Sequence, residues 1–415
     1  MSTIRGTRAT GNINSNIIKR DVSDVISFLN QGMYPIVFLS QKPLIKGGSF
    51  GSNFNSKQIN LSKRTVKNTK FEWIEDELLE NKTTVSVDYV AGTAGSSMTI
   101  DVADASIFSV EDVIMNMTTK EQMLVSSVDV SANQLTVIAG WSDAGTVAAG
   151  TAGDTITRLG SAFDEGSEAG DSRSRQKELK YNYVQFFRTP FDYTVREGKI
   201  SQWGENDPIY QRGIKGVEHL MEIERQFIFG KKYKAINSTT GYEVSSTGGI
   251  LEFIDNDSNS VKRDLGNVAI TKDLFNVFLR DAFTYTKTKE KYLLCSGTLL
   301  QAINDFYEGK IVFNDKLTSI NINAQYIETA DGRVNLIRHP LLADTAFGAS
   351  GTEGNFGLML EMPEISYVVF DNEDTALESV SLSNNKKVVK EEYTTTAGVE
   401  VRLPKLHSYI YNFTV

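Results

Sequence analysis

Histidine, the side chain that most often moves protons near neutral pH, occurs at three positions in the 415 residues: His219, His339 and His407. His219 and Glu222 are three residues apart and would share a helix face, so they could contact a metal ion together. No HExxH spacing completes such a ligand set. We interpret His219 as a surface histidine beside a solvated Glu222 carboxylate and expect structural roles for His339 and His407. The sequence predicts no metal ion and no cofactor.

Cys295 is the single cysteine, so the chain can form neither an internal disulfide nor a cysteine-based zinc cluster. It ends an apolar run and precedes Ser296, Gly297 and a helical pattern, an order that superficially resembles a nucleophile turn. The residues do not match GxSxG, and no histidine is close in sequence. The glycine-rich pieces near Gly47 and Gly92 lack the lysine and threonine of a phosphate loop. A hydrolase using Cys295 or a serine is therefore the weakest hypothesis, and we predict no catalytic residue and no enzyme.

The overall charge is acidic. Lysine and arginine total 43 against 52 aspartates and glutamates, which gives a net charge of -9 and disfavours tight sequence-specific binding to DNA. Hydrophobic residues at 40% and charged residues at 23% are typical of soluble globular chains. The first 20 residues are positively charged but contain no apolar run, so they predict no signal peptide. The apolar runs of the chain are far shorter than the ~18 residues of a membrane span, so none is predicted. A reducing cytosol is the expected compartment.

The first element that the sequence predicts is a basic arm at the N-terminus. Residues 1–20 carry Arg5, Arg8, Lys19 and Arg20 without an acidic residue, which is typical of an extended arm or of a solvated tail. Residues 21–30 then place apolar side chains at helical spacing and predict a short amphipathic helix.

A change in composition marks residues 92–158. Glycine, alanine, serine, threonine and valine dominate, and short strand patterns are separated by turns. We predict an all-β insertion, a compact sandwich or barrel, with glycine-marked ends. Removing residues 92–158 with a short linker is expected to leave the remaining fold intact.

The charge changes sign after the insertion. Acidic residues between 164 and 171 are followed by basic residues between 173 and 180. This arrangement indicates either acidic-to-basic docking between copies of the chain or a flexible charged loop. Reversing Arg173 and Arg175 to glutamate is expected to impair assembly more than monomer stability. The candidate subunit contacts are Trp73, Glu165, Glu168, Arg173, Arg175 and Arg196.

The strongest single element is a helix over 207–230. Asp207 is a natural N-cap, Pro208 suits the first helical position, and Gly230 ends an apolar stripe that recurs every three or four residues. At 1.5 Å per residue the helix would be about 33 Å long. Beyond residue 248, mixed patterns predict a helix around 274–282, a strand ending at Cys295, a helix over 298–307, a β-hairpin turning at Asp331-Gly332 and further strands. The predicted fold class is α+β.

The order of these parts resembles the major capsid proteins of tailed bacteriophages with the Hong Kong 97 capsid fold. The segments that carry the resemblance are TKFEWIEDEL, FDEGSEAGDSRSR, DPIYQRGIKGVEHLMEIERQFIFG, ADGRVNLIRHPLL and AGVEVRLPKLHSYIYNF. The resemblance implies an N-terminal arm, an extended loop, a peripheral domain with a long spine helix, and an axial domain. These parts would span 1–64 (arm), 65–91 and 159–196 (extended loop), 92–158 (β insertion), 197–252 and 360–415 (peripheral domain) and 253–359 (axial domain).

The resemblance also implies a function. The chain would be a major capsid protein whose copies self-assemble, as pentamers and hexamers, into the icosahedral shell around the phage genome. Portal and decoration or cement proteins would be further partners, double-stranded DNA would lie nearby without specific contacts, and no membrane would be involved. The protein would be assembled in the bacterial host cytoplasm and end in the virion. The alternative is a decoration or tail structural protein, which the β insertion suggests and which would attach to preformed particles.

Overall fold

The computed structural model describes Ile36 and residues 62–166, 172–200, 207–307, 312–313, 324–343, 355–371, 373–380 and 387–414. The helix predicted over 21–30 and the basic arm lie outside these residues. The chain divides into two compact units, residues 1–73 with 181–415 (unit 1) and residues 74–180 (unit 2). Its mixture of helices and strands agrees with the α+β prediction. None of the described helices is long and apolar enough to cross a membrane.

The first sheet of unit 1 is organised around β21 (Val388–Val401). β10 (Gln185–Thr194) pairs antiparallel along one edge of β21. On the other edge, β20 (Ala376–Val380) and β19 (Ile365–Phe370) pair antiparallel with successive parts of β21. β1 (Ser62–Val66) lies parallel to β19 on its far side. The five strands therefore form one layer. It has four strands side by side where β1 and β19 lie (β1, β19, β21, β10) and three where β20 lies (β20, β21, β10).

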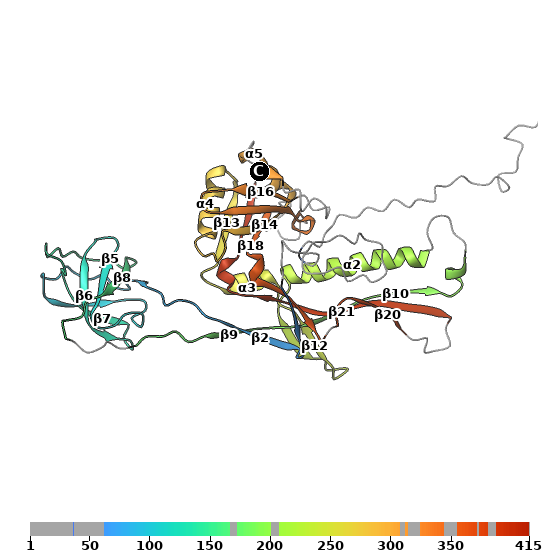
Figure 1. Ribbon diagram of the computed structural model, residues 1–415, viewed down its shortest axis with the longest axis horizontal. Helices are drawn as coiled ribbons and strands as arrows, with labels where there is room; N and C mark the ends of the chain where they lie inside the picture. The colour runs from blue at the N-terminus through green and yellow to red at the C-terminus, as the bar shows by residue number, and fades with distance from the viewer. Residues whose placement is uncertain are drawn as a thin grey trace, which may run out of the picture. The chain divides into compact units, whose positions relative to one another are not determined.

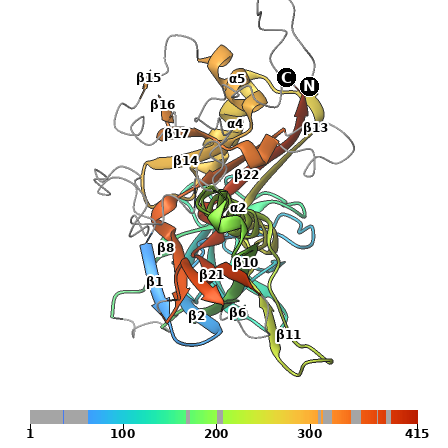
Figure 2. The same ribbon diagram turned by 90° about the vertical axis from the view of Figure 1, so that its right-hand side faces the viewer.

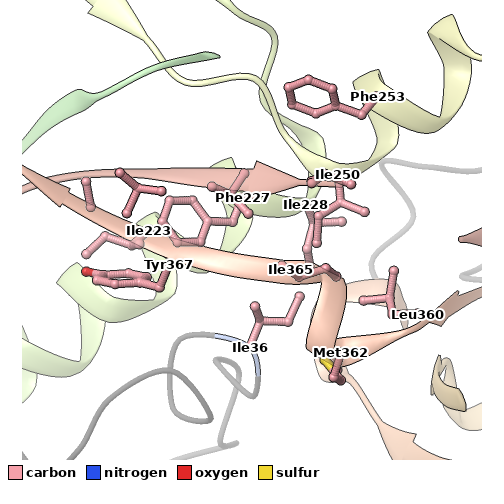
Figure 3. Close-up of a cluster of buried hydrophobic side chains, with 14 of the residues drawn as sticks. Ile36, Ile223, Phe227, Ile228, Ile250, Phe253, Leu360, Met362, Ile365 and Tyr367 are labelled. Atoms are coloured by element: carbon pink, nitrogen blue, oxygen red, sulfur yellow. The ribbon is translucent and has the colours of Figure 1, made fainter. Parts of the chain in front are cut away.

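Helix α2 (Asp207–Phe229) confirms the helix predicted over 207–230 and runs along β10 and β21 (Figure 1). The helix forms because its apolar residues recur at helical spacing, and three of them, Ile223, Phe227 and Ile228, have no exposed surface. Each buried side chain of this size contributes about 1.5–3 kcal/mol to stability. Figure 3 shows the helix residues in one cluster with Tyr367 of β19, whose ring lies 5.5 Å from that of Phe227.

Gly230 ends α2 as predicted. Its backbone N–H donates to the carbonyl oxygen of Gln226 at 2.8 Å. A Cβ atom at this position would lie 2.4 Å from that oxygen and 2.6 Å from the carbonyl oxygen of Thr247. Only glycine allows the backbone to approach this closely, so the helix end is tightly packed against the following chain.

The second sheet of unit 1 is covered by α4 (Lys272–Ala282) and α5 (Gly297–Phe306), which share one apolar core with it. Figure 2 shows both helices beside the strands. The predicted hairpin at Asp331-Gly332 is confirmed, since its two strands pair antiparallel. The strands, in sheet order, are β13 (Val261–Ala269), β22 (Ser408–Thr414), β18 (Phe356–Leu360), β14 (Glu290–Cys295), β17 (Arg333–Arg338), β16 (Ala324–Glu328) and β15 (Val312–Phe313).

Shorter elements complete unit 1. After α2, a hairpin of β11 (Tyr233–Ile236) and β12 (Glu243–Ser246) leads into α3 (Ile250–Asn256). The chain passes from unit 1 to unit 2 within β2 (Lys70–Glu75) and returns within β9 (Glu178–Tyr183), and these two strands pair with each other.

Unit 2 contains strands and no helix in its described residues. One six-stranded sheet has the order β3 (Lys82–Thr84), β8 (Thr155–Ser161), β5 (Asp112–Asn116), β6 (Gln122–Asp129), β7 (Gln134–Ile138) and β4 (Ser97–Asp101). A bridge between Val85 and Val102 joins the two edges, so the sheet closes on itself around an apolar core. This barrel extends beyond the predicted range 92–158 on both sides, because β3 precedes it and β8 continues past its end.

Candidate subunit interface

His219 is buried, so its interpretation as a surface histidine is wrong. Its Nδ1 lies 2.8 Å from the hydroxyl of Thr189 on β10, and its Nε2 lies 2.7 Å from the hydroxyl of Thr395 on β21. Burial lowers the pKa of His219 to about 4, which keeps the ring neutral near pH 7. Glu222 is exposed, as predicted. The ring therefore joins α2 to the sheet, and its nitrogens are occupied by hydroxyl groups.

His339 belongs to a second buried group. Its Nε2 lies 2.9 Å from Oε1 of Glu224 on α2, and the backbone N–H of Ile36 donates to the same oxygen at 2.9 Å. Glu224, His339 and Ile36 are all fully buried. Figure 3 shows Ile36 close to β19, with α2 beside it. The group ties Ile36 and His339 to α2, which agrees with the structural role predicted for His339.

His407 is also structural. Its Nδ1 accepts a hydrogen bond from the backbone N–H of Glu361 at 3.2 Å. Burial, followed by the charge of Lys291, lowers the pKa of His407 to about 3. Lys291 is itself fully buried and donates to the carbonyl oxygens of Ala282 and Leu406, each at 2.6 Å. Burial lowers the pKa of Lys291 to about 8. The lysine satisfies a carbonyl at the end of α4, and its bonds hold β14 to the turn before β22.

Cys295 has no exposed surface, and burial raises the pKa of its thiol to about 12. A thiol with so high a pKa is a poor nucleophile, because the thiolate is the reactive form. Ser296 caps α5, since its side chain accepts a hydrogen bond from the backbone N–H of Leu299. Within the described ranges, acidic, histidine and cysteine side chains form no group able to hold a metal ion.

Trp73, a candidate subunit contact, lies inside unit 1. Its side chain is 6% exposed, and its ring lies 5.6 Å from that of Phe253 on α3 and 6.0 Å from that of Phe71. The indole therefore anchors β2 in the core of its own subunit. Its contact with a neighbouring subunit stays a prediction.

Arg173 and Arg175 are engaged inside unit 2. The Arg173 guanidinium lies 3.1 Å from the carboxylate of Asp112, which is 1% exposed, and also donates to the carbonyl oxygen of Ile107. Arg158 lies 2.8 Å from the same carboxylate. Arg175 pairs with Glu77 at 3.1 Å. Sequence reasoning missed the Asp112 contact, because this buried aspartate lies 61 positions away from Arg173.

The other candidate contacts occupy the surface or lie outside the described residues. Glu165 is exposed on a turn after β8. Arg196 is exposed, and its carbonyl oxygen accepts a hydrogen bond from Lys199 in the 3₁₀ turn η2 (Glu197–Lys199). Glu168 lies outside the described residues.

The first sheet offers a groove on the face that α2 does not cover. Thr395 bonds to His219 of α2, so strand alternation places Thr394 and Thr396 on the opposite face. A groove of about 540 Å³ opens on this face. The side chain of Phe186, which lines the groove, is 55% exposed. The groove is lined by Thr69, Phe186, Phe370, Glu373, Asp374, Ala376, Glu378, Thr394, Thr395 and Thr396.

Comparison with known proteins identifies the class of protein. A family model described as "SU10 major capsid protein" matches residues 4–414. Because this match covers nearly the whole chain, the protein belongs to the SU10 major capsid protein family. The prediction of a phage major capsid protein, the subunit of a capsid shell, is confirmed and is supported over the decoration or tail alternative. The family is one of structural virion proteins.

Individual relatives are more distant. The major capsid protein of Pseudomonas phage PaMx41 is 22% identical over 296 residues, which cover 67% of this chain and 68% of the relative. The solved capsid of a native GTA particle is 8% identical, with 98% of this chain and 99% of that chain covered, at a TM-score of 0.48. The solved capsid of Myoviridae phage XM1 is 13% identical, with 60% and 81% covered, at a TM-score of 0.38. These scores are too low to assign a fold, so the family match carries the conclusion.

Proposed function

We propose that copies of this chain assemble, as pentamers and hexamers with the Hong Kong 97 capsid fold, into an icosahedral shell around double-stranded phage DNA. The observation that carries the proposal is the family match over residues 4–414. In this layout α2 is the spine helix. Its sheet belongs to the peripheral domain, which would then also take in β10 from the segment predicted as extended loop (159–196). The sheet with α4 and α5 belongs to the axial domain, which would then also take in β22 from the segment predicted as peripheral (360–415). The strands β2 and β9 form part of the extended loop, and unit 2 contains the inserted barrel.

The surface chemistry supports this function. A net charge of -9 leaves no overall attraction to a polyanion, so shell walls of this composition would enclose DNA without binding it tightly. Three histidines and one cysteine are fully buried and occupied by structural contacts. A symmetric shell needs many subunit contacts that can each be weak, because multivalency stabilises the whole. We propose that assembly takes place in the bacterial host cytoplasm, that the protein has no enzymatic activity, and that portal and decoration proteins join the shell.

Shell formation is tested by expressing the full chain with and without helper proteins. We expect large, regular particles in light scattering and electron microscopy. Circular dichroism of the same samples verifies that any unassembled protein is folded. A folded protein that stays monomeric under every assembly condition would overturn the proposal. Attachment to preformed particles without shell formation would instead support the decoration alternative.

A further inference from the structure

The net charge of the chain is divided unevenly between its two units. Unit 2 (residues 74–180) contains 18 acidic and 7 basic residues, which gives it a net charge of -11. The whole chain carries -9, so unit 1 carries +2, although it contains most of the residues. The acidic character of the protein is therefore a property of unit 2.

The basic side chains of unit 2 do little to neutralise its surface. Four of the seven contact acidic groups of the same unit, in the pairs Arg158–Asp112, Arg173–Asp112, Arg175–Glu77, Arg175–Glu178 and Lys180–Glu178. Because Arg158 and Arg173 share the buried carboxylate of Asp112, two positive charges are used at one buried group. Few cations are left to balance the carboxylates at the surface of the unit.

The exposed carboxylates of unit 2 are spread around it. Eight of them form no ion pair with any described residue, and they lie in or beside the connections between strands. They are Asp76, Glu80, Asp88, Asp104, Asp129, Asp143, Asp164 and Glu165. Among the described residues, acidic side chains do not gather into a group that could hold a metal ion. A surface of this kind attracts a diffuse layer of cations from the solvent and does not depend on one bound ion.

We infer that unit 2 makes assembly of the shell depend on ionic strength, because the acidic barrels of neighbouring copies repel one another until salt screens their charges. Charges at a surface interact over ~30 Å in 0.01 M salt, ~10 Å in 0.1 M salt and ~3 Å in 1 M salt. Each copy in a shell brings one barrel close to those of its neighbours, so repulsion opposes assembly at low salt and fades as salt rises. The inference rests on the proposed function, since it concerns contacts between copies in a shell.

Attraction between unit 2 and a neighbouring copy would have the opposite dependence on salt. If unit 2 docked on unit 1 of the next copy through opposite charges, screening would weaken assembly. The energy between two charged bodies scales with the product of their charges, and this product is about five times larger for two barrels than for a barrel and unit 1. Repulsion between barrels is therefore the larger effect, and assembly should strengthen as salt rises.

The inference is tested with full-length variants that lower the charge of unit 2 from -11 to -7 at different positions. The first variant replaces aspartates by asparagine, whose side-chain oxygen can keep the hydrogen bonds that Asp88, Asp104 and Asp129 accept from backbone N–H groups. Its changes are Asp88→Asn, Asp104→Asn, Asp129→Asn and Asp143→Asn. The second variant combines Asp143→Lys with Glu165→Lys, at two exposed positions. The matched control carries glutamate at the four positions of the first variant, so its charge stays at -11.

Assembly of each protein is followed by light scattering and electron microscopy in NaCl from about 0.01 to 1 M, and circular dichroism verifies that the variants are folded. We expect the parent chain and the control to reach half-maximal assembly at the same NaCl concentration. Both variants should reach it at a concentration at least about twofold lower.

Four outcomes would overturn the inference while particles still form and the proposed function stands. They are equal midpoints in all proteins, a midpoint of the control that shifts with the variants, a shift in only one of the two variants, and assembly that weakens as NaCl rises. Absence of particles from the parent chain at every salt concentration would instead overturn the proposed function, and the inference with it.

Discussion

The imidazole of His219 bridges two threonine hydroxyls at the junction of α2 with β10 and β21. Its folded-state pKa of about 4 lies below the value near 6.5 of an unfolded chain. The unfolded state therefore binds more protons between these values. As a result, the free energy of unfolding falls as the pH falls through this window, by up to about 1.4 kcal/mol per pH unit. His407, with a pKa of about 3, contributes with the same sign.

The variant His219→Gln tests this linkage, because glutamine retains hydrogen-bonding groups but does not titrate. We expect a smaller loss of stability between about pH 6.5 and pH 4 than in the parent chain, although the variant is less stable at about pH 7. Urea unfolding followed by circular dichroism at several pH values gives the two slopes. His407 remains in both proteins as an internal control. Equal slopes would contradict a buried, neutral His219.

The arginines at 173 and 175 provide a second test at this scale. Arg173→Glu would place a carboxylate beside buried Asp112, which we expect to destabilise unit 2 by about 3 kcal/mol. Arg175→Glu breaks only the more exposed pair with Glu77 and should cost about 1 kcal/mol or less. Thermal unfolding of both variants measures the difference. If both variants were as stable as the parent chain, the sequence-based expectation that both reversals act on assembly more than on stability would hold instead.

At the scale of elements, one glycine inside α2 and one at its end should respond oppositely to the same change. Gly230→Ala would press a methyl group against two carbonyl oxygens and is expected to cost about 2 kcal/mol. Gly213 lies inside α2 with no atom within 4 Å of a Cβ at that position, so Gly213→Ala should stabilise the helix by up to about 1 kcal/mol. Denaturant unfolding of the two variants gives both values. A gain from Gly230→Ala would show that the helix end is loosely packed.

Local sequence patterns were sufficient to predict the elements whose signals lie within a few neighbouring residues. The 207–230 helix, the hairpin at Asp331-Gly332 and the strand ending at Cys295 all follow from periodicity or turn chemistry. The burial of His219 did not, because a histidine on a mostly polar helix face gives no sign of the two threonines that meet it. The ion pair of Arg173 with Asp112 depends on contacts distant in sequence, which no spacing rule encodes.

At the scale of the whole molecule, unit 1 should fold without the barrel. The two apolar cores of unit 1 contain no residue between 74 and 180, and the barrel core contains only residues of unit 2. Replacing residues 77–176 by a short flexible linker keeps β2 and β9 and should leave α2 and both sheets folded. Near-ultraviolet circular dichroism and thermal unfolding measure this. Global unfolding of the variant would show that the barrel is integral to the fold.

The deletion of residues 92–158 that the sequence suggested serves as a comparison with the variant that lacks residues 77–176. It would cut through β8, remove the partners of β3 and leave part of the barrel behind. We expect this variant to aggregate. The sequence missed the true extent of the barrel because β3 has three residues, lysine and two threonines, without an apolar pattern. Its place in the sheet is settled by pairing with β8, which lies more than seventy positions later.

The bridge between Val85 and Val102 affects how the barrels of many subunits behave when they are crowded together. A shell holds copies of one polypeptide at very high local concentration, the condition under which exposed β-ribbons stack into fibrils. A closed barrel whose two edge strands are joined offers no exposed strand edge as a template for such stacking. Each particle can therefore carry many of these cylinders close together while they remain separate bodies.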